Sequence, residues 1–233
     1  MLSTRLDQTV DAEGPISRWK GVYRAGGAAA LVGAVFIPIQ IIVFIMWPPP
    51  STVIGYFTVF QNNRLLGLLD LDLLLIVQNA LGVVVILALY IALKRTGESI
   101  MAVAVLLGLV GAAAYFAANP AFSMLFLSDQ YAAATTEAQK AMCLAAGQAM
   151  LAMYNGTAFH ANYILGTIAL FIISMVMLRS NTFSKATAYV GIVANILAFG
   201  LYVPAIGIYV SIISVLFLWI WYLLIARRLF QLE

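Results

Sequence analysis

The stretch RLLGLLDLDLLLIVQNALG, residues 64–82, places four polar side chains in a run of leucines: Asp70, Asp72, Gln78 and Asn79. An ionisable group inside a membrane span is costly unless it faces a bundle interior or a water-filled cavity. Carboxylates and amides in such places bind ligands or transfer protons. The stretch is therefore a candidate functional site, provided that neighbouring helices enclose it.

Helical spacing separates the two aspartates. Asp70 and Asp72 are about 200° apart on a helix, whereas Asp72 and Asn79 are seven residues apart and share one stripe. We therefore expect Asp72 to face the interior and Asp70 to pair with Arg64 or Lys140, or to face the interface. An alternative stays open, because residues 73–93 are long enough to span a bilayer alone. Both aspartates would then lie in the outer headgroup layer, where a charge costs little.

Further polar residues fall at a similar depth near the outer ends of other apolar segments. We predict that they meet Asp72 in a polar pocket that opens outward and binds a ligand. The alternative is that each amide hydrogen-bonds separately to a neighbouring helix. The candidate ligand-binding residues are Asp72, Asn79, His160, Asn195, Gln40, Asp70, Gln78, Asn119 and Asn155.

His160 is the single histidine of the chain. With Asp72 as its partner it could transfer protons, because the unperturbed pKa of imidazole lies near neutral pH. At the end of a span it could equally serve as an interfacial hydrogen-bonding group. We assign no catalytic residue from the sequence.

The composition predicts a membrane protein. Of the 233 residues, 64% are hydrophobic and 9% are charged, whereas a soluble domain carries about 25% charged residues. A crossing needs about 20 apolar residues, and six segments are long enough. We therefore predict an all-α bundle of six spans over residues 23–228. The predicted spans are Gly26–Trp47, Leu65–Leu93, Ser99–Ala118, Thr157–Leu178, Phe183–Val203 and Ile206–Ala226.

The basic residues predict the orientation of this bundle. With both termini in the cytoplasm, ten Lys and Arg residues fall on the inner side and two, Arg64 and Lys140, on the outer side. The positive-inside rule favours this N-in, C-in arrangement. Residues 1–22 are then a cytoplasmic arm and residues 229–233 a cytoplasmic tail. The inner set is Arg5, Arg18, Lys20, Arg24, Lys94, Arg95, Arg179, Lys185, Arg227 and Arg228.

Two outer segments are predicted to be amphipathic and to cover the pocket, residues 51–63 and 121–154. Three prolines, residues 48–50, end the first span, and Ser51 can begin a short interfacial helix. Thr135 or Thr136 can cap a second helix with Glu137 in its first turn. We expect the alanine- and methionine-rich face of this helix to lie against the bundle.

Small residues recur every four positions within two predicted spans, as Ala29 and Gly33, and as Ala104, Gly108 and Ala112. Such faces allow helices to approach closely, within one chain or in an oligomer. One cysteine and one histidine make a zinc site improbable, and we expect no metal and no cofactor. The scattered basic residues do not form a nucleic-acid stripe.

Three stretches resemble a family of bacterial multi-span membrane proteins that is catalogued only as a domain of unknown function. They are WPPPSTVIGYFTVFQNNRLLGLLDLDLL, then NPAFSMLFLSDQY with YNGTAFHANYILG, and FSKATAYVGIVANILAFGLYVP. The resemblance covers about residues 23–228. It implies a multi-pass protein of the bacterial inner (plasma) membrane with about six spans, and it implies no activity.

The sequence is compatible with three functions. The first is the binding or translocation of a small apolar or lipid-like ligand through the outer pocket. The second is an intramembrane acid/base enzyme that uses Asp72 and His160. The third is a non-catalytic membrane subunit or assembly factor. In each case membrane lipids are the expected surroundings.

Overall fold

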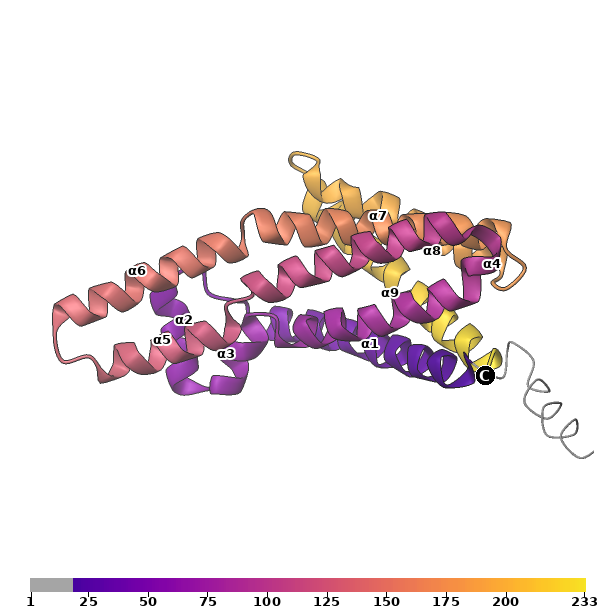
Figure 1. Cartoon of the computed structure of the whole chain (residues 1–233). Coiled ribbons are helices and arrows are strands. Elements are labelled where there is room, and N and C mark those ends of the chain that lie inside the picture. The colour runs from indigo at the N-terminus through magenta and orange to yellow at the C-terminus, as the bar shows by residue number, and fades with distance from the viewer. Residues whose placement is uncertain (1–18) are drawn as a thin grey trace, which may run out of the picture.

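The computed structural model describes residues 19–233, and most of the predicted arm, residues 1–22, lies outside them. The described residues are 87% helical and form no strand, which confirms the all-α prediction. Figure 1 shows the arrangement of the helices. They are α1 (Lys20–Met46), α2 (Val53–Asn62), α3 (Arg64–Asp70), α4 (Leu73–Ala118), α5 (Ala121–Ala133), α6 (Glu137–Tyr154), α7 (Thr157–Arg179), α8 (Lys185–Ala198), the 3₁₀ helix η2 (Phe199–Tyr202) and α9 (Gly207–Gln231).

The helices form two groups, each with its own hydrophobic core. The first group, which we call the bundle, contains α1, α4, α7, α8 and α9, and its core includes Leu89, Ile173 and Trp221. The second group, which we call the cap, contains α2, α3, α5 and α6. Its core includes Phe57, Phe60 and Met124. The cap lies beyond one end of the bundle (Figure 1).

Helix α4 folds back on itself. The backbone leaves the helical region at Gly97, and the chain reverses there (Figure 1). Ile86 consequently packs against Gly108, although 22 residues of straight helix would separate them by about 33 Å. The first half of α4, residues 73–96, and the second half, residues 98–118, are therefore antiparallel neighbours.

Five described helices are long and apolar enough to cross a membrane, when each of the nearly continuous pairs α4–α5 and α6–α7 is counted as one. In the bundle, α1 packs on α4, α4 on α7, α7 on α8, α8 on α9, and α9 on α1. This ring leaves many apolar side chains exposed on its outside, among them Ile45, Leu106 and Leu216. A surface of this kind suits acyl chains rather than water, so the chain is a membrane-embedded protein.

Small residues permit the close packing within this ring. Gly26 of α1 lies directly against Ala88 of α4, and Gly191 of α8 lies against Ser174 and Trp221. The two faces predicted from small-residue spacing are also buried within the chain, as Ala29 and Ala104 illustrate. They contribute to the fold of one chain and do not form an open surface.

The cap differs from the flat cover that the sequence suggested. Helices α5 and α6 form a hairpin that extends along the long axis of the bundle and beyond its end (Figure 1). The apolar side of α6, with Cys143 and Leu151, packs into the cap core. The expectation that this side lies against the bundle is therefore wrong.

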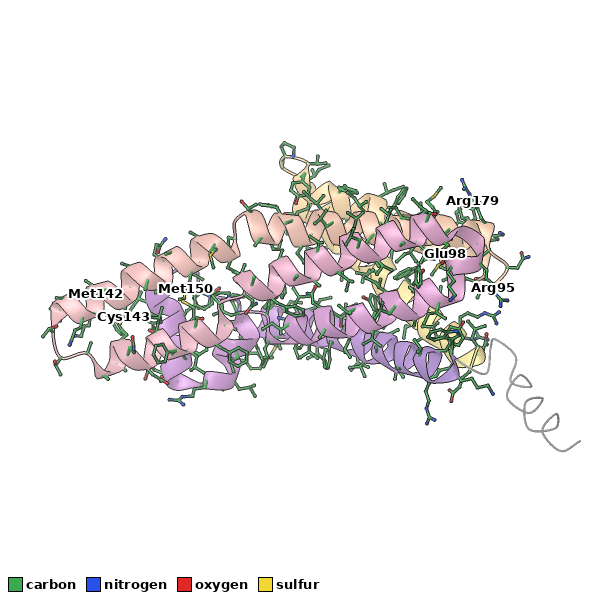
Figure 2. All side chains as sticks on the ribbon, in the orientation of Figure 1. Arg95, Glu98, Met142, Cys143, Met150 and Arg179 are labelled. Atoms are coloured by element: carbon green, nitrogen blue, oxygen red, sulfur yellow. The ribbon has the colours of Figure 1, made fainter. Side chains whose placement is uncertain are left out.

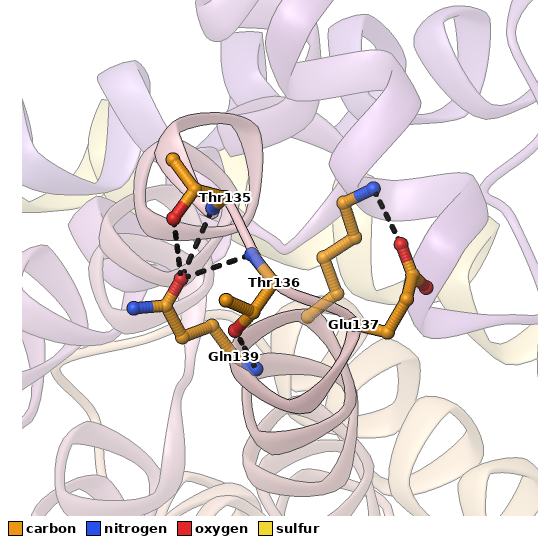
Figure 3. Close-up of polar contacts among 5 residues, drawn as sticks. Thr135, Thr136, Glu137 and Gln139 are labelled. Carbon is orange, nitrogen blue, oxygen red and sulfur yellow. Dashed lines mark hydrogen bonds and ion pairs between the residues drawn. The ribbon is translucent and has the colours of Figure 1, made fainter.

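The start of α6 confirms the predicted N-terminal capping residue, Thr136. Thr136 accepts a hydrogen bond from the Gln139 backbone N–H, and the Gln139 side chain accepts one from the Thr136 backbone N–H (Figure 3). This reciprocal pair is a capping box, which satisfies two backbone donors at the helix start. Helix α2 begins one residue later than expected, because Thr52 caps it in place of Ser51.

Two predicted boundaries are wrong. Residues 65–93 do not form one helix, because α3 ends at Asp70 and α4 begins at Leu73. The predicted tail, residues 229–233, is largely the last turn of α9, which continues to Gln231. The first difference matters most, since the break falls at the two aspartates.

Candidate ligand cavity and buried carboxylates

The break between α3 and α4 places Asp72 in a left-handed backbone conformation, with φ 64° and ψ 36°. Aspartate tolerates this conformation better than most residues because its short polar side chain bonds locally. Asp72 makes no side-chain bond to the start of α4. Its carboxylate is instead free to contact helices that lie far away in the sequence.

Two tyrosines hold the Asp72 carboxylate. Tyr115 of α4 donates a hydrogen bond to Oδ2 across 3.3 Å, and Tyr154 of α6 donates a short one to the same oxygen. Asn119 donates to the Tyr115 hydroxyl across 3.2 Å, which directs the tyrosine proton toward Asp72. Burial, followed by the Asp72 charge, raises the pKa of Tyr154, so its phenol keeps the proton that it donates. The cluster joins the cap to the bundle.

Asp70 is buried and lacks such partners. Its side chain is 4% exposed, and its Oδ1 atom has no hydrogen-bond partner. The predicted pairing with Arg64 or Lys140 is wrong, because Arg64 binds Asp129 and Lys140 binds Glu137. Burial raises the pKa of Asp70 to about 6.

The ring of helices surrounds a partly open pocket of about 480 Å³, which we call the cavity. This volume lies in the range of small-molecule sites. The wall is mainly apolar, with polar groups from α1, both halves of α4, α7, α8 and α9. The polar lining residues are Gln40, Gln78, Asn79, Tyr115, Asn162, Tyr163, Thr167, Asn195, Ser211, Ser214 and Tyr222.

Several of these polar groups already have partners across the ring. Asn162 of α7 donates to Asn79 of α4 across 3.2 Å. The Tyr163 hydroxyl donates to the Ala198 carbonyl across 2.8 Å. Gln40 donates to the carbonyl of Leu69 in α3 of the cap across 3.4 Å. These bonds fix part of the polar wall, whereas the Oε1 atoms of Gln40 and Gln78 are buried without a hydrogen-bond partner.

No charged residue of the described part lines the cavity. The Asp72 carboxylate lies behind the wall, where it accepts a hydrogen bond from the lining residue Tyr115. Leu74 and Leu75, which lie two and three residues after Asp72 in the first turn of α4, also line the cavity. Asp72 therefore lies at the cap end of an otherwise uncharged space.

The structure gathers only part of the predicted pocket. Gln40, Gln78, Asn79 and Asn195 line the cavity. Asn195 bonds to the Gly191 carbonyl of its own helix and not to a neighbouring helix, as the alternative would require. Asp72 and Asn119 reach the cavity through Tyr115, and Asp70 is buried two residues before Asp72.

His160 and Asn155 lie outside this arrangement. Asn155 is exposed and bonds to the Leu151 carbonyl. His160 is exposed, and its Nδ1 lies 3.0 Å from the Tyr202 hydroxyl. No hydrogen bond in the described part joins His160 to Asp72, so the expected acid/base pair does not form in this structure.

Sequence reasoning overlooked the tyrosines. Tyr115, Tyr154 and Tyr163 provide hydroxyl groups that make hydrogen bonds between distant segments at the site. Tyrosine near the end of a span is usually interfacial, which hides such a role. One signal was present, because Tyr115 precedes Asn119 by four residues and therefore shares its face of the helix.

Comparisons with known proteins give no match, neither to a family model, nor to a curated protein, nor to a solved structure. The resemblance to the bacterial membrane family therefore stays a prediction.

Proposed function

We propose that this protein crosses the bilayer six times and binds a small apolar or lipid-like ligand in the bundle cavity. The six crossings are α1, the two antiparallel halves of α4, α7, α8 with η2, and α9. The reversal at Gly97 supports this count, because it divides α4 into two segments that each approach the thickness of a hydrocarbon core.

Charge supports an orientation with the cap outside and both termini in the cytoplasm of a bacterial inner membrane. Arg95 and Arg179 lie at one end of the bundle, and the labelled residues of the cap lie at the other (Figure 2). The C-terminus lies at the same end as Arg95 (Figure 1). Positive charge concentrates on the cytoplasmic side of membrane proteins.

The observation that carries the ligand proposal is the cavity itself. It is large, mainly apolar and ringed by fixed amide and hydroxyl groups. A mainly apolar pocket of this size, with a few convergent polar groups, is typical of a small-molecule site. Its location within the membrane-embedded bundle favours a ligand that partitions into lipid.

The other two functions lack such support. The acid/base enzyme needs Asp72 and His160 together, and each has other partners. The subunit hypothesis needs an open small-residue face, and the predicted faces are buried. Ligand binding is the function that the geometry favours.

Filling the cavity tests the proposal. Gly166 of α7 lines the cavity, and a Cβ atom added there meets no atom within 4 Å. Gly166→Leu is therefore expected to fold and to exclude the ligand. Gly21→Leu is the matched control, since Gly21 also has free space but does not line the cavity.

The measurement is mass spectrometry of small molecules that co-purify with the full chain in mild detergent. We expect one lipid-like species to accompany the natural protein and Gly21→Leu, and to be reduced at least about tenfold with Gly166→Leu. Equal retention by all three proteins would show that the molecule is bound elsewhere.

A further inference from the structure

The two aspartates between the cap and the bundle are buried without a cation. Asp70 is 4% exposed and Asp72 is 8% exposed. Three ion pairs join described residues, and neither aspartate takes part in any of them. A buried carboxylate without a cationic partner loses hydration, and hydrogen bonds such as those from Tyr115 and Tyr154 to Asp72 restore only part of that loss. Neither aspartate has a positive counter-charge among the described residues.

Both carboxylates act on the same region. Burial, followed by the charges of Asp70 and Asp72, raises the pKa of Tyr56 in the cap to about 12. Tyr115 lines the cavity and donates a hydrogen bond to Asp72, so the Asp72 carboxylate lies directly behind this part of the wall. The cap end of the cavity is therefore its negative end.

The cavity wall also suits a cation with a large apolar body. Six aromatic rings line it, and no lysine, arginine or histidine of the described part does. Aromatic faces attract cations, most strongly where water is excluded. The aromatic lining residues are Phe36, Phe44, Tyr115, Phe159, Tyr163 and Tyr222.

The geometry points to a lipophilic organic cation as the ligand, with its charge directed to Asp72 and its apolar body held between the aromatic rings. This inference rests on the proposed function, because it names the class of molecule that the same cavity binds. A neutral lipid would fill the space equally well but would leave both carboxylates without a counter-charge. A lipophilic anion would be repelled.

Probes of one shape and opposite charge test this inference. Tetraphenylphosphonium and tetraphenylborate are nearly the same size, and triphenylphosphine oxide is a neutral relative. Binding of each is measured by equilibrium dialysis to the full chain in nanodiscs of zwitterionic lipid, with empty nanodiscs as the blank. We expect the cation to bind most tightly and the anion not to bind above the blank.

Asp72→Asn tests how much the negative charge of Asp72 contributes to cation binding. Asparagine also tolerates the left-handed conformation, so the variant keeps the shape of the site. We expect its affinity for tetraphenylphosphonium to fall at least about tenfold, with affinity for the neutral probe unchanged. Asp129→Asn is the control, because it removes an exposed carboxylate that pairs with Arg64 outside the cavity. Should Asp72→Asn not fold, Asp70→Asn removes the neighbouring charge and is expected to weaken cation binding by a smaller factor.

The outcomes separate this inference from the proposed function. Equal affinity of the natural protein and Asp72→Asn for the cation would overturn the inference, as would tight binding of tetraphenylborate. If the neutral probe binds and Gly166→Leu blocks it, the cavity remains a ligand site. If no probe binds and no molecule co-purifies, the proposed function fails as well.

Discussion

Asp70 and Asp72 show how the immediate surroundings of a carboxylate decide what it can do. Asp72 receives two tyrosine hydrogen bonds, whereas one oxygen of Asp70 is buried without any. A hydrogen-bonded carboxylate retains part of the stabilisation that water would provide, and an unpaired one does not. Asp70 is therefore expected to destabilise the fold when it is charged.

Asp70→Asn is predicted to stabilise the protein near neutral pH. The pKa of Asp70 is about 6 in the folded protein and about 4 in an unfolded chain. The folded state therefore binds more protons between these values, and its stability falls as pH rises from about 4 to 6. Removing the charge should raise the free energy of unfolding by about 1 kcal/mol at pH 7.5.

Thermal unfolding in detergent at about pH 4 and about pH 7.5 provides the measurement. The difference between Asp70→Asn and the natural protein should be small at the lower pH, where Asp70 is protonated in the folded state. A variant that is less stable at both values would show that the Asp70 carboxylate has a stabilising partner.

Residue types in the sequence predicted where polar groups would gather but not how they would be paired. Gln40, Gln78, Asn79 and Asn195 were expected at the pocket, and they line the cavity. The partners of Asp72 were not expected, because Tyr115 and Tyr154 lie 43 and 82 residues away in the sequence. Local spacing carries no information about such distant contacts.

At the scale of elements, the tightest contacts occur where a glycine lets two helices meet. A Cβ atom at Gly191 of α8 would overlap Ser174 of α7 and the Trp221 ring of α9. Three helices of the ring therefore meet at this residue. Gly166 of α7 has no atom within 4 Å of its Cβ position and is the natural comparison.

Gly191→Ala is predicted to destabilise the bundle, because the extra methyl group forces three helices apart. The expected loss in the free energy of unfolding is about 1–3 kcal/mol. Gly166→Ala should instead be neutral or slightly stabilising, since alanine favours helix more than glycine does. Thermal unfolding of both variants in the same detergent provides the measurement. Equal melting temperatures would mean that α8 shifts to accept the methyl group.

Apolar length predicted that the elements exist, and it predicted one of the two places where the chain changes direction. The reversal at Gly97 was expected as a loop between spans, and the basic pair Lys94 and Arg95 indicated it. The break at Leu71 was not expected, because leucines continue on both sides of it. A run of uniform hydropathy contains no signal for a single left-handed residue.

At the scale of the whole molecule, the cap is the feature that composition described least well. Helices α6 and α7 continue one another over 43 residues, which is about 64 Å of helix and twice the hydrocarbon thickness. The outer part of this length cannot lie within the same bilayer core. Some of its apolar residues, Cys143 and Leu151, are instead buried in the separate core of the cap, whereas Met142 and Met153 are exposed.

The number of crossings can be tested with single cysteines, because the chain has one cysteine to replace, Cys143. Three exposed positions sample the ends of the molecule: Ala141 in the cap, Ser99 beside the reversal of α4, and Gln231 at the end of α9. Each is changed to cysteine in a Cys143→Ala background. A maleimide that does not cross membranes is then applied to intact cells and to permeabilised cells.

Six crossings place Ala141 on the opposite side from Ser99 and Gln231. The cysteine of Ala141→Cys should therefore react in intact cells, and those of Ser99→Cys and Gln231→Cys only after permeabilisation. If α4 did not cross twice, Ser99 would share the compartment of Ala141. If the total were odd with the cap outside, Gln231 would react in intact cells whenever the N-terminus is inside. Since Asp72 lies where α4 enters the cap, the same experiment decides whether the negative end of the cavity faces the outside of the cell.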